Sequence, residues 1–402
     1  MFPPAFAPRM GYICKYLLHY GCEVNIVTES ISDTMYQFLS KDREVEYVDF
    51  HPKKTRLEWF SVFFKDLLYG YKDKEMVQAA EKFLQKETYD GILCSTYRTF
   101  PLPAAQHLAH KYNLPFIADC RDIVEQYPGG EFISSSFHFT PTIDQLIIKL
   151  FRHHLLKGRN KALLKADAVT TVSSWHVEVL KAINSHTHLI FNGFDPELFY
   201  PKTISSETFN LTYAGRILSL KIRDPRMLLQ ALRILIDQEK IDPQITRVQW
   251  YMDEASNALI RPIAHELKLE NQMVYNGFIE ADQIPQAYHK SAILLQIANK
   301  MGTKGPKGIM TTKLFESFAV EKPVLCIPSD ENCLETTIKE AKAGIAARTV
   351  AEATSFILEQ YQTWQEKGYT TQLPNKPFVQ KFSRAYQAQQ FMNLFTEIKK
   401  KK

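Results

Sequence analysis

Basic residues gather directly after a short apolar run near the middle of the chain. The run ends as Tyr-Ala-Gly-Arg at Tyr213–Arg216, and Lys221 follows before a helix that opens at Arg223–Pro225. At the carboxyl end of a parallel strand, backbone amides face the ligand, and Gly215 would let a phosphate approach the backbone. Arg216 and Lys221 would supply fixed positive charge, which suits the departure of a nucleoside diphosphate. An ordinary surface turn is the alternative for a lone Gly-Arg pair.

A second group of polar residues opens a predicted helix further along the chain. Thr311 and Thr312 stand where they could cap this helix, and Lys313 and Glu316 lie in its first turns. A carboxylate in this place can accept both hydroxyls of a ribose, as the acidic residue of dinucleotide-binding folds does. The alternative is that both charges are solvated on the helix surface.

Polar residues also follow predicted strands in the first half of the chain. They are Asp119, Arg121 and Asp122 after one strand, Ser173 after the next, and Asn192 with Gly193 after the last. The charged cluster that begins at Asp119 forms either a salt-bridged loop or a polar surface that faces an acceptor. The Asn-Gly pair is a strong turn signal, and it stands next to a predicted linker.

The elements that would position these residues alternate between short apolar runs and longer helical stretches, a pattern typical of parallel sheets covered by helices. Expected strands in the first half are Glu23–Thr28, Gly91–Ser95, Pro115–Asp119, Ala168–Val172 and His188–Phe191. Those in the second half are Phe209–Gly215, Val248–Met252, Met273–Asn276, Ala292–Gln296, Pro323–Ile327 and Gly344–Ala347. Expected helices include Met76–Lys86, Ala104–Lys111 and Ser174–Ile183.

The length of the chain predicts two domains, because 402 residues exceed what one hydrophobic core usually supports. Asp195–Ser206 carries two prolines and no periodicity, as a linker would. The first domain would then span residues 1–202 and the second residues 203–378. Residues 379–402 would form a C-terminal helix and a Lys-rich tail.

The start of the chain is unusual for a doubly wound domain, which normally opens with a buried strand. Here the first predicted element is a helix at Gly11–Tyr20. We therefore expect a longer natural chain to supply an apolar strand before Met1.

Composition and charge exclude several classes of protein. A formal charge of +5 is far from the concentrated basic surface of a nucleic-acid binder, so no nucleic-acid partner is expected. No apolar run reaches the roughly 18 residues of a membrane span, and no secretory signal opens the chain, which predicts a cytoplasmic protein. The six cysteines are scattered singly, which favours buried thiols over disulfides or a metal site.

A basic stretch at residues 146–165 is a candidate membrane contact. It mixes apolar residues with Arg152, Lys157, Arg159, Lys161 and Lys165. Such a helix could rest on the anionic inner face of the cell membrane and make the protein peripheral there. A solvated surface helix is the alternative.

Several short motifs, in this order and spacing, resemble family 4 of the retaining glycosyltransferases. They are Phe-Pro-Pro near the start, Gly21–Thr28, Ala166–Ser173, Phe191–Phe199, Tyr213–Arg216, Lys313–Pro323 and Phe382–Arg384. The resemblance implies the GT-B architecture, in which two Rossmann-like domains with doubly wound parallel sheets face each other across a cleft. It also implies that the C-terminal helix crosses back to the first domain.

The resemblance also implies roles for individual residues. Arg216 and Lys221 resemble the basic pair that holds the donor diphosphate and assists its departure. Glu316 resembles the second acid of the family's Glu-x7-Glu signature, which binds the ribose. Gly277 and Phe278 resemble the loop that lies along the base. We assign these residues to the donor, together with Gly215, Thr312 and Lys313.

The chain departs from the family's pattern at three places. The first acid of the signature is replaced by Gly308, the usual glycine-rich first loop contains Arg9, and the histidine often found in the first domain is replaced by Arg121. The resemblance at the nucleotide site remains despite these substitutions, but it no longer indicates which residues bind the donor sugar. Arg9 joins the candidates on the acceptor side.

The resemblance implies retaining transfer from a nucleoside-diphosphate sugar to a glycan or lipid-linked acceptor in cell-surface polysaccharide biosynthesis. Preorganised positive charge would carry the stabilisation, with no metal ion and no cofactor. The alternative is a non-catalytic subunit that binds a sugar nucleotide, which Gly308 and the missing strand suggest. A nucleotide-sugar epimerase would need acidic and histidine residues that the sequence does not place.

Overall fold

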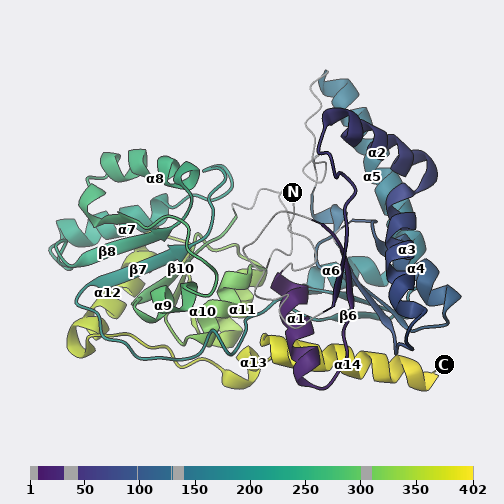
Figure 1. Cartoon of the computed structure of the whole chain (residues 1–402). Helices are drawn as coiled ribbons and strands as arrows, with labels where there is room; N and C mark the ends of the chain where they lie inside the picture. The colour runs from purple at the N-terminus through teal and green to yellow at the C-terminus, as the bar shows by residue number, and fades with distance from the viewer. Residues whose placement is uncertain are drawn as a thin grey trace. The chain divides into compact units, whose positions relative to one another are not determined.

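Parallel strands and the helices between them build two separate units of the chain (Figure 1). The computed structural model describes residues 8–30, 44–96, 98–127, 129, 140–299 and 310–401. Unit 1 contains the chain up to Phe191 and again from Arg384 onward, whereas unit 2 contains Asn192–Gly305 and Ile309–Ser383. The chain therefore passes into unit 2 before the boundary expected near Lys202.

Unit 2 is built on a six-stranded sheet in the order β12-β11-β10-β7-β8-β9. Its strands are β7 (Phe209–Ala214), β8 (Thr246–Tyr251), β9 (Met273–Tyr275), β10 (Ile293–Ile297), β11 (Val324–Ile327) and β12 (Gly344–Ala346). Its helices are α7 (Arg226–Asp237), α8 (Glu254–Glu266), α9 (Ile284–His289), α10 (Thr312–Ala319), α11 (Cys333–Ala341), α12 (Val350–Lys367) and α13 (Lys376–Gln380). Because every pairing is parallel, the carboxyl ends of these strands share one edge.

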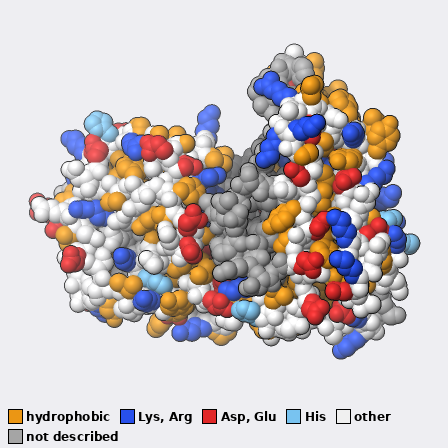
Figure 2. All heavy atoms as spheres, viewed as in Figure 1, with side chains coloured by type: hydrophobic (Ala, Val, Ile, Leu, Met, Phe, Trp, Pro, Cys, Tyr) orange, Lys and Arg blue, Asp and Glu red, His pale blue; other side chains and the backbone are white. Residues whose placement is uncertain are grey.

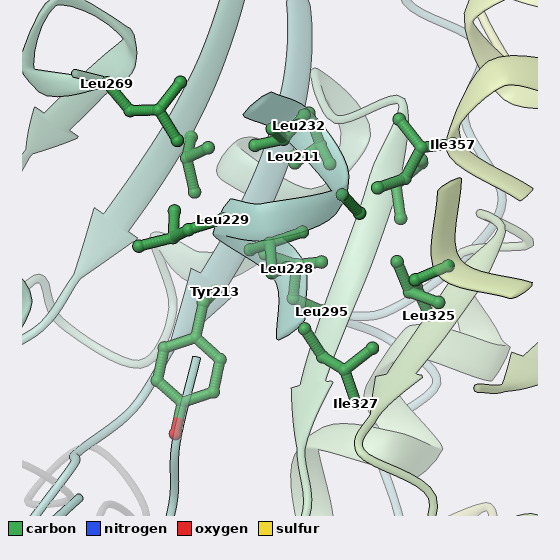
Figure 3. Close-up of a cluster of buried hydrophobic side chains, with 14 of the residues drawn as sticks. Leu211, Tyr213, Leu228, Leu229, Leu232, Leu269, Leu295, Leu325, Ile327 and Ile357 are labelled. Carbon is green, nitrogen blue, oxygen red and sulfur yellow. The ribbon is translucent and has the colours of Figure 1, made fainter. Parts of the chain in front are cut away.

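The core of unit 2 lies between the sheet and helices such as α7. Leu228, Leu229 and Leu232 recur at helical spacing on one face of α7, and all three are buried. Figure 3 shows them among Leu211 of β7 and Leu295 of β10. Burying each such side chain contributes about 1.5–3 kcal/mol, so this face holds the helix on the sheet.

Unit 1 contains a four-stranded parallel sheet in the order β3-β4-β5-β6 and a separate parallel pair, β1-β2. The strands are β1 (Ile26–Glu29), β2 (Val45–Val48), β3 (Ile92–Thr96), β4 (Phe116–Cys120), β5 (Ala168–Thr171) and β6 (Thr187–Leu189). The helices are α1 (Pro8–His19), α2 (Arg56–Tyr69), α3 (Tyr71–Leu84), α4 (Leu102–Lys111), α5 (Pro141–Leu163), α6 (Ser174–Lys181) and α14 (Arg384–Lys401).

Strand β4 shows how unit 1 is layered. Its side chains are all buried, and successive residues point to opposite faces of the sheet. Phe116 and Ala118 pack in a cluster with residues of α4, α5 and α6, whereas Ile117 packs with residues of α1 and α14. The predicted return of the C-terminal helix to the first domain is confirmed, since α14 lies against α1 within unit 1.

The predicted fold class, α/β with doubly wound parallel sheets, is confirmed. Each expected strand is present with its ends moved by a few residues, and β2 is a strand that the sequence did not predict. The strand expected before Met1 lies outside the chain and stays a prediction. None of the described helices is both long and apolar enough to cross a membrane.

Candidate functional site

The donor candidates collect at the carboxyl edge of the unit 2 sheet. Gly215 and Arg216 follow β7, Asp253 follows β8, Phe278 follows β9 and Asn299 follows β10. These strands are neighbours in the order β10-β7-β8-β9, so the loops that leave them are neighbours too. This is the edge at which open parallel sheets bind their ligands.

Arg216 is exposed but held in a defined orientation. Its Nε lies 3.2 Å from Asp253 Oδ2, and its guanidinium carbon lies 5.0 Å from the centre of the Phe278 ring. Asp253 also caps α8, and its Oδ1 accepts the Ser256 amide at 2.8 Å. Hydrogen bonds from Ser256, and after them the charge of Arg216, lower the pKa of Asp253. The guanidinium, 60% exposed, thus stays available to a ligand.

Arg223 folds back from the start of α7 onto the same loop. Its Nη1 donates to the Arg216 carbonyl at 3.0 Å, and its Nε donates to Asn299 Oδ1 at 2.9 Å. These two bonds tie the loop after β7 to the loop after β10. The sequence marked Arg223 only as a residue at a helix start, and it predicted no partnership with Asn299.

Lys313 brings a further cation to this place from the first turn of α10. A Cβ atom built on Gly215 would lie 2.1 Å from Lys313 Nζ, so the absence of a side chain at Gly215 makes room for the ammonium group. Nζ also lies 5.5 Å from the centre of the Tyr213 ring. Burial, together with the charges of Arg223 and Arg216, lowers the pKa of Lys313 to about 8. The positive charges of Arg216, Arg223 and Lys313 therefore lie close enough to repel one another.

Glu316 lies one turn after Lys313 on α10, and its charge partly offsets the lowering of the Lys313 pKa. Burial raises the pKa of Tyr288, and the negative charge of Glu316 raises it further. The expected capping by a threonine side chain is wrong. Thr311 occupies the N-cap position, but its hydroxyl donates to Gln296 Oε1 at 3.3 Å, and its side chain makes no cap hydrogen bond. Thr312 is the first residue of α10 and is half-buried.

Two further donor candidates, Lys221 and Gly277, lie in the loops that follow β7 and β9. Lys221 is exposed, its amide donates to Ser219 Oγ at 3.1 Å, and its charge is not among those that shift the pKa of Lys313. Gly277 has φ of +73°, a left-handed conformation that favours glycine, with open space where a Cβ would lie. Gly308 lies outside the described residues.

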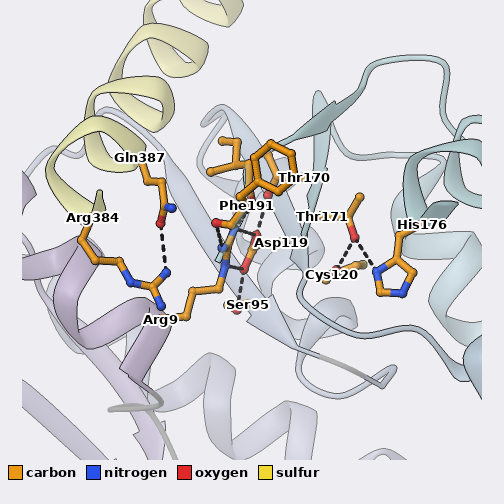
Figure 4. Close-up of polar contacts among 11 residues, drawn as sticks. Arg9, Ser95, Asp119, Cys120, Thr170, Thr171, His176, Phe191, Arg384 and Gln387 are labelled. Atoms are coloured by element: carbon orange, nitrogen blue, oxygen red, sulfur yellow. Dashed lines mark hydrogen bonds and ion pairs between the residues drawn. The ribbon is translucent and has the colours of Figure 1, made fainter. Parts of the chain in front are cut away.

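On the acceptor side, Arg9 and Asp119 form a buried ion pair (Figure 4). Arg9 Nε donates to Asp119 Oδ2 at 3.0 Å and Nη2 to Oδ1 at 2.9 Å, while Nη1 donates to the Phe191 carbonyl at 2.6 Å. The Ser95 hydroxyl donates to Asp119 Oδ2, and the Thr170 hydroxyl donates to Asp119 Oδ1, each at 2.7 Å. Both charged side chains are at most 3% exposed, so they join elements inside unit 1 and do not face an acceptor.

The remaining candidates of unit 1 adjoin a second polar network. Arg121 and Asp122 follow β4 and are half-buried. Burial raises the pKa of Asp122, and the positive charge of Arg121 offsets only part of this rise. Asp122 Oδ1 accepts Gln126 Nε2 at 3.3 Å, and Gln126 Oε1 lies 3.0 Å from His176 Nε2. Ser173 is 2% exposed, and its hydroxyl caps α6. Its role is therefore to begin a helix.

Asn192 and Gly193 begin unit 2, and Gly193 is buried. The next residue, Phe194, forms a parallel bridge with Ser383, and its amide donates to the Phe382 carbonyl at 2.9 Å. The Asn-Gly segment thus leads into a contact with the end of unit 2.

The basic stretch at residues 146–165 lies mostly in α5, and two of its cations point into the protein. Arg159 is 1% exposed and forms a bidentate pair with Glu125 at 2.6 and 2.7 Å. Arg152 donates to the carbonyls of Val124, Tyr127 and Gly129. Lys157, Lys161 and Lys165 are exposed. The expected basic face of this helix is accordingly smaller than its sequence indicates.

Within the part of the chain that the structure describes, no group of three or more His, Cys, Asp or Glu side chains is arranged to hold a metal ion.

Comparison with known proteins identifies the fold. No family model matches the chain, and no curated protein sequence is similar to it. Among solved structures it is similar to HepE from Anabaena in complex with UDP, with a TM-score of 0.63 and 16% identity over 98% of both chains. A glycosyltransferase from Rickettsia africae has a TM-score of 0.61 and 15% identity over 99% of this chain and 97% of its own.

Sucrose-phosphate synthase from Thermosynechococcus elongatus is also similar, with a TM-score of 0.59 and 15% identity over 97% of this chain and 92% of its own. At these identities the likeness shows the fold alone. The fold is GT-B, with two Rossmann-like domains of mixed α/β structure.

Proposed function

We propose that this chain is a glycosyltransferase that moves a sugar from a nucleoside-diphosphate sugar to a glycan or lipid-linked acceptor. The observation that carries the proposal is the convergence of Arg216, Arg223 and Lys313 at the carboxyl edge of the unit 2 sheet. Like charges held this close repel each other, and a diphosphate among them would relieve that repulsion. HepE, a protein of the same fold, has been solved with UDP and with UDP-glucose, which supports this class of donor.

Each residue at this edge then has a role toward the donor. Arg216 and Lys221 stabilise the charge that develops on the leaving diphosphate, and Lys313 and Gly215 receive its phosphates. Glu316 accepts the ribose hydroxyls. Phe278 and Gly277 lie along the base, and Thr312 presents the first turn of α10 to the phosphates.

We further propose that transfer retains the configuration of the sugar and needs no metal ion. The bond between the anomeric carbon and the diphosphate breaks, the acceptor oxygen bonds to the same face of that carbon, and the acceptor proton passes to a diphosphate oxygen. Fixed cations offset the negative charge throughout, so no protein nucleophile is required.

The setting that fits these substrates is cell-surface polysaccharide biosynthesis. The protein would work in the cytoplasm, as a peripheral protein at the inner face of the cell membrane, where lipid-linked acceptors are presented.

Arginine and lysine substitutions test the donor site. Arg216→Ala and Lys221→Ala should each lower kcat for transfer, or for hydrolysis of the donor, by about 100-fold, because each removes a cation that acts on the leaving group. Arg233→Ala is a matched control, since Arg233 pairs with Asp237 near the far end of α7. Circular dichroism would show whether each variant folds.

Undiminished turnover of the Arg216 variant would count against this site. Calorimetry with uridine and guanosine diphosphates, combined with a turnover assay, distinguishes a transferase from the alternative, a non-catalytic subunit that binds a sugar nucleotide. If the wild-type chain binds a diphosphate but turns over none of a panel of sugar nucleotides, it is a binding subunit and not a transferase.

A further inference from the structure

Helix α2 of unit 1 carries its apolar side chains on the outside of the protein. Eight large side chains of this helix are between 45% and 83% exposed: Leu57, Trp59, Phe60, Phe63, Phe64, Leu67, Leu68 and Tyr69. Only Val62 is buried, in a small cluster with Phe50 and Met76. Figure 2 shows hydrophobic side chains gathered over this region at the upper right. Exposed apolar surface of this extent marks an interaction site.

The acidic residues of α2 face the protein, and most of its apolar residues face outward. Glu58, Val62 and Asp66 recur every four residues, and these are the positions that the burial pattern turns toward the protein. Glu58 Oε2 accepts the Lys53 amide at 2.9 Å, and Asp66 Oδ1 accepts the Lys72 amide at 3.0 Å. Both acids of α2 are thus engaged with backbone amides beside the helix. The outward side of α2 carries no acid.

The charges that remain on or beside this outward side are positive. Arg56 and Lys65 lie on exposed positions of α2, and Lys53 and Lys54 are exposed immediately before it. The chain as a whole also has a formal charge of +5. A second copy of the same basic surface would be repelled, whereas an anionic surface would be attracted.

We propose that α2 lies in the surface of an anionic lipid bilayer, with its phenylalanine and leucine side chains inserted among the acyl chains. The helix has 14 residues, which is too short to span a bilayer, and its mixture of aromatic, aliphatic and basic residues is typical of helices that lie in the membrane plane. Each basic residue near such a surface adds to the attraction. This surface is in unit 1, so the inference is independent of the donor site.

Co-sedimentation with vesicles tests this inference. The wild-type chain should sediment with vesicles of phosphatidylglycerol and phosphatidylcholine, and less with phosphatidylcholine alone. The triple variant Phe60→Ser, Phe64→Ser and Leu67→Ser should lower the partition coefficient by at least about tenfold, since it removes three inserted side chains. The double variant Arg56→Glu with Lys65→Glu should lower binding to the anionic vesicles and leave binding to phosphatidylcholine vesicles unchanged.

The matched control is Tyr200→Ser with Leu373→Ser, which removes exposed apolar side chains from unit 2 and should leave vesicle binding unchanged. Lys157→Glu with Lys161→Glu reports separately on α5. Circular dichroism and binding of UDP would show that each variant is folded.

Two outcomes would overturn the inference. One is equal sedimentation of the wild-type chain and the triple variant. The other is that light scattering shows a dimer for the wild-type chain and a monomer for the triple variant, while the wild-type chain binds no vesicles. In that case α2 would contact a second copy of the chain.

Discussion

Lys313 is the residue whose protonation should govern donor binding. Its pKa is lowered to about 8 by burial and by Arg223 and Arg216, so its charge is present below pH 8 and is lost above it. A bound diphosphate would favour the protonated form. We therefore expect the affinity for UDP to fall by up to about tenfold per pH unit above pH 8, and binding near that pH to take up a proton.

Calorimetry in buffers with different ionisation enthalpies would measure both effects. In Lys313→Arg the guanidinium keeps its charge throughout this range, so the pH dependence should flatten. Lys313→Met should bind weakly at every pH. A pH profile that is the same in the wild-type chain and Lys313→Met would contradict the assignment.

His176 should make the stability of unit 1 depend on pH. It is 1% exposed, its Nδ1 lies 3.2 Å from the Thr171 hydroxyl, and burial lowers its pKa to about 4 from an ordinary 6.5. Because the folded state binds this proton less tightly than the unfolded state, protonation favours unfolding. The free energy of unfolding should therefore lose about 3 kcal/mol from this group as pH falls from 6.5 to 4.

Urea unfolding at several pH values, compared between the wild-type chain and His176→Gln, would isolate this contribution from the carboxylates that titrate in the same range. The glutamine can keep the bond to Gln126 and carries no charge. Identical pH dependence in both proteins would show that His176 is not the group responsible.

Part of the candidate site could be predicted from the sequence, because its residues follow apolar strands directly. Gly215 and Arg216 were expected from such a pattern, and Glu316 was expected from its place near the start of a predicted helix. Arg223 was not assigned to the site, since its partner Asn299 is 76 positions away. The pairing of Arg9 with Asp119, 110 positions apart, has no local signal, and the cluster at Asp119 was accordingly interpreted in part as an acceptor surface.

At the scale of elements, the Arg9–Asp119 pair joins α1 to β4. Burial alone would raise the pKa of Asp119, but the charge and hydrogen bonds of Arg9, together with the hydroxyls of Thr170 and Ser95, outweigh burial, and the pKa lies below its usual value. Arg9→Met should lower the free energy of unfolding by about 3–5 kcal/mol, since it leaves a buried carboxylate without its cation. The double variant with Asp119→Leu should lose less. Chemical denaturation would measure both, and equal losses would show that the pair is not coupled.

The elements were easiest to predict where burial was complete. Strands such as β7 and β10 are buried along their whole length, and most of their residues are apolar. Strand β2 has four residues, one of which is exposed, and its pattern is too short to distinguish from a loop. Helix α2 was not predicted, because its apolar residues extend around much of the helix and do not form the single stripe that marks a helix packed on a core.

At the scale of the whole molecule, binding of UDP should leave a mark on one unit in particular. The donor candidates named here, from Gly215 to Glu316, all belong to unit 2, while the buried networks of Asp119 and His176 belong to unit 1. A ligand that binds the native state slows hydrogen exchange at the groups it holds. We expect UDP to protect residues 215–223 and the first turn of α10 most strongly. Hydrogen exchange followed by mass spectrometry would measure this, and protection largest around Asp119 would contradict it.

The packing of α14 on α1 has a consequence for synthesis on the ribosome. Unit 2 ends at Ser383, whereas unit 1 needs α14, whose residues Arg384–Lys401 are translated after all of unit 2. Phe391 and Leu394 of α14 complete the cluster around Ile13 and Ile117. The half of the protein that is translated first is therefore the last that can finish folding, and chaperones would meet its uncovered sheet face until α14 has been translated.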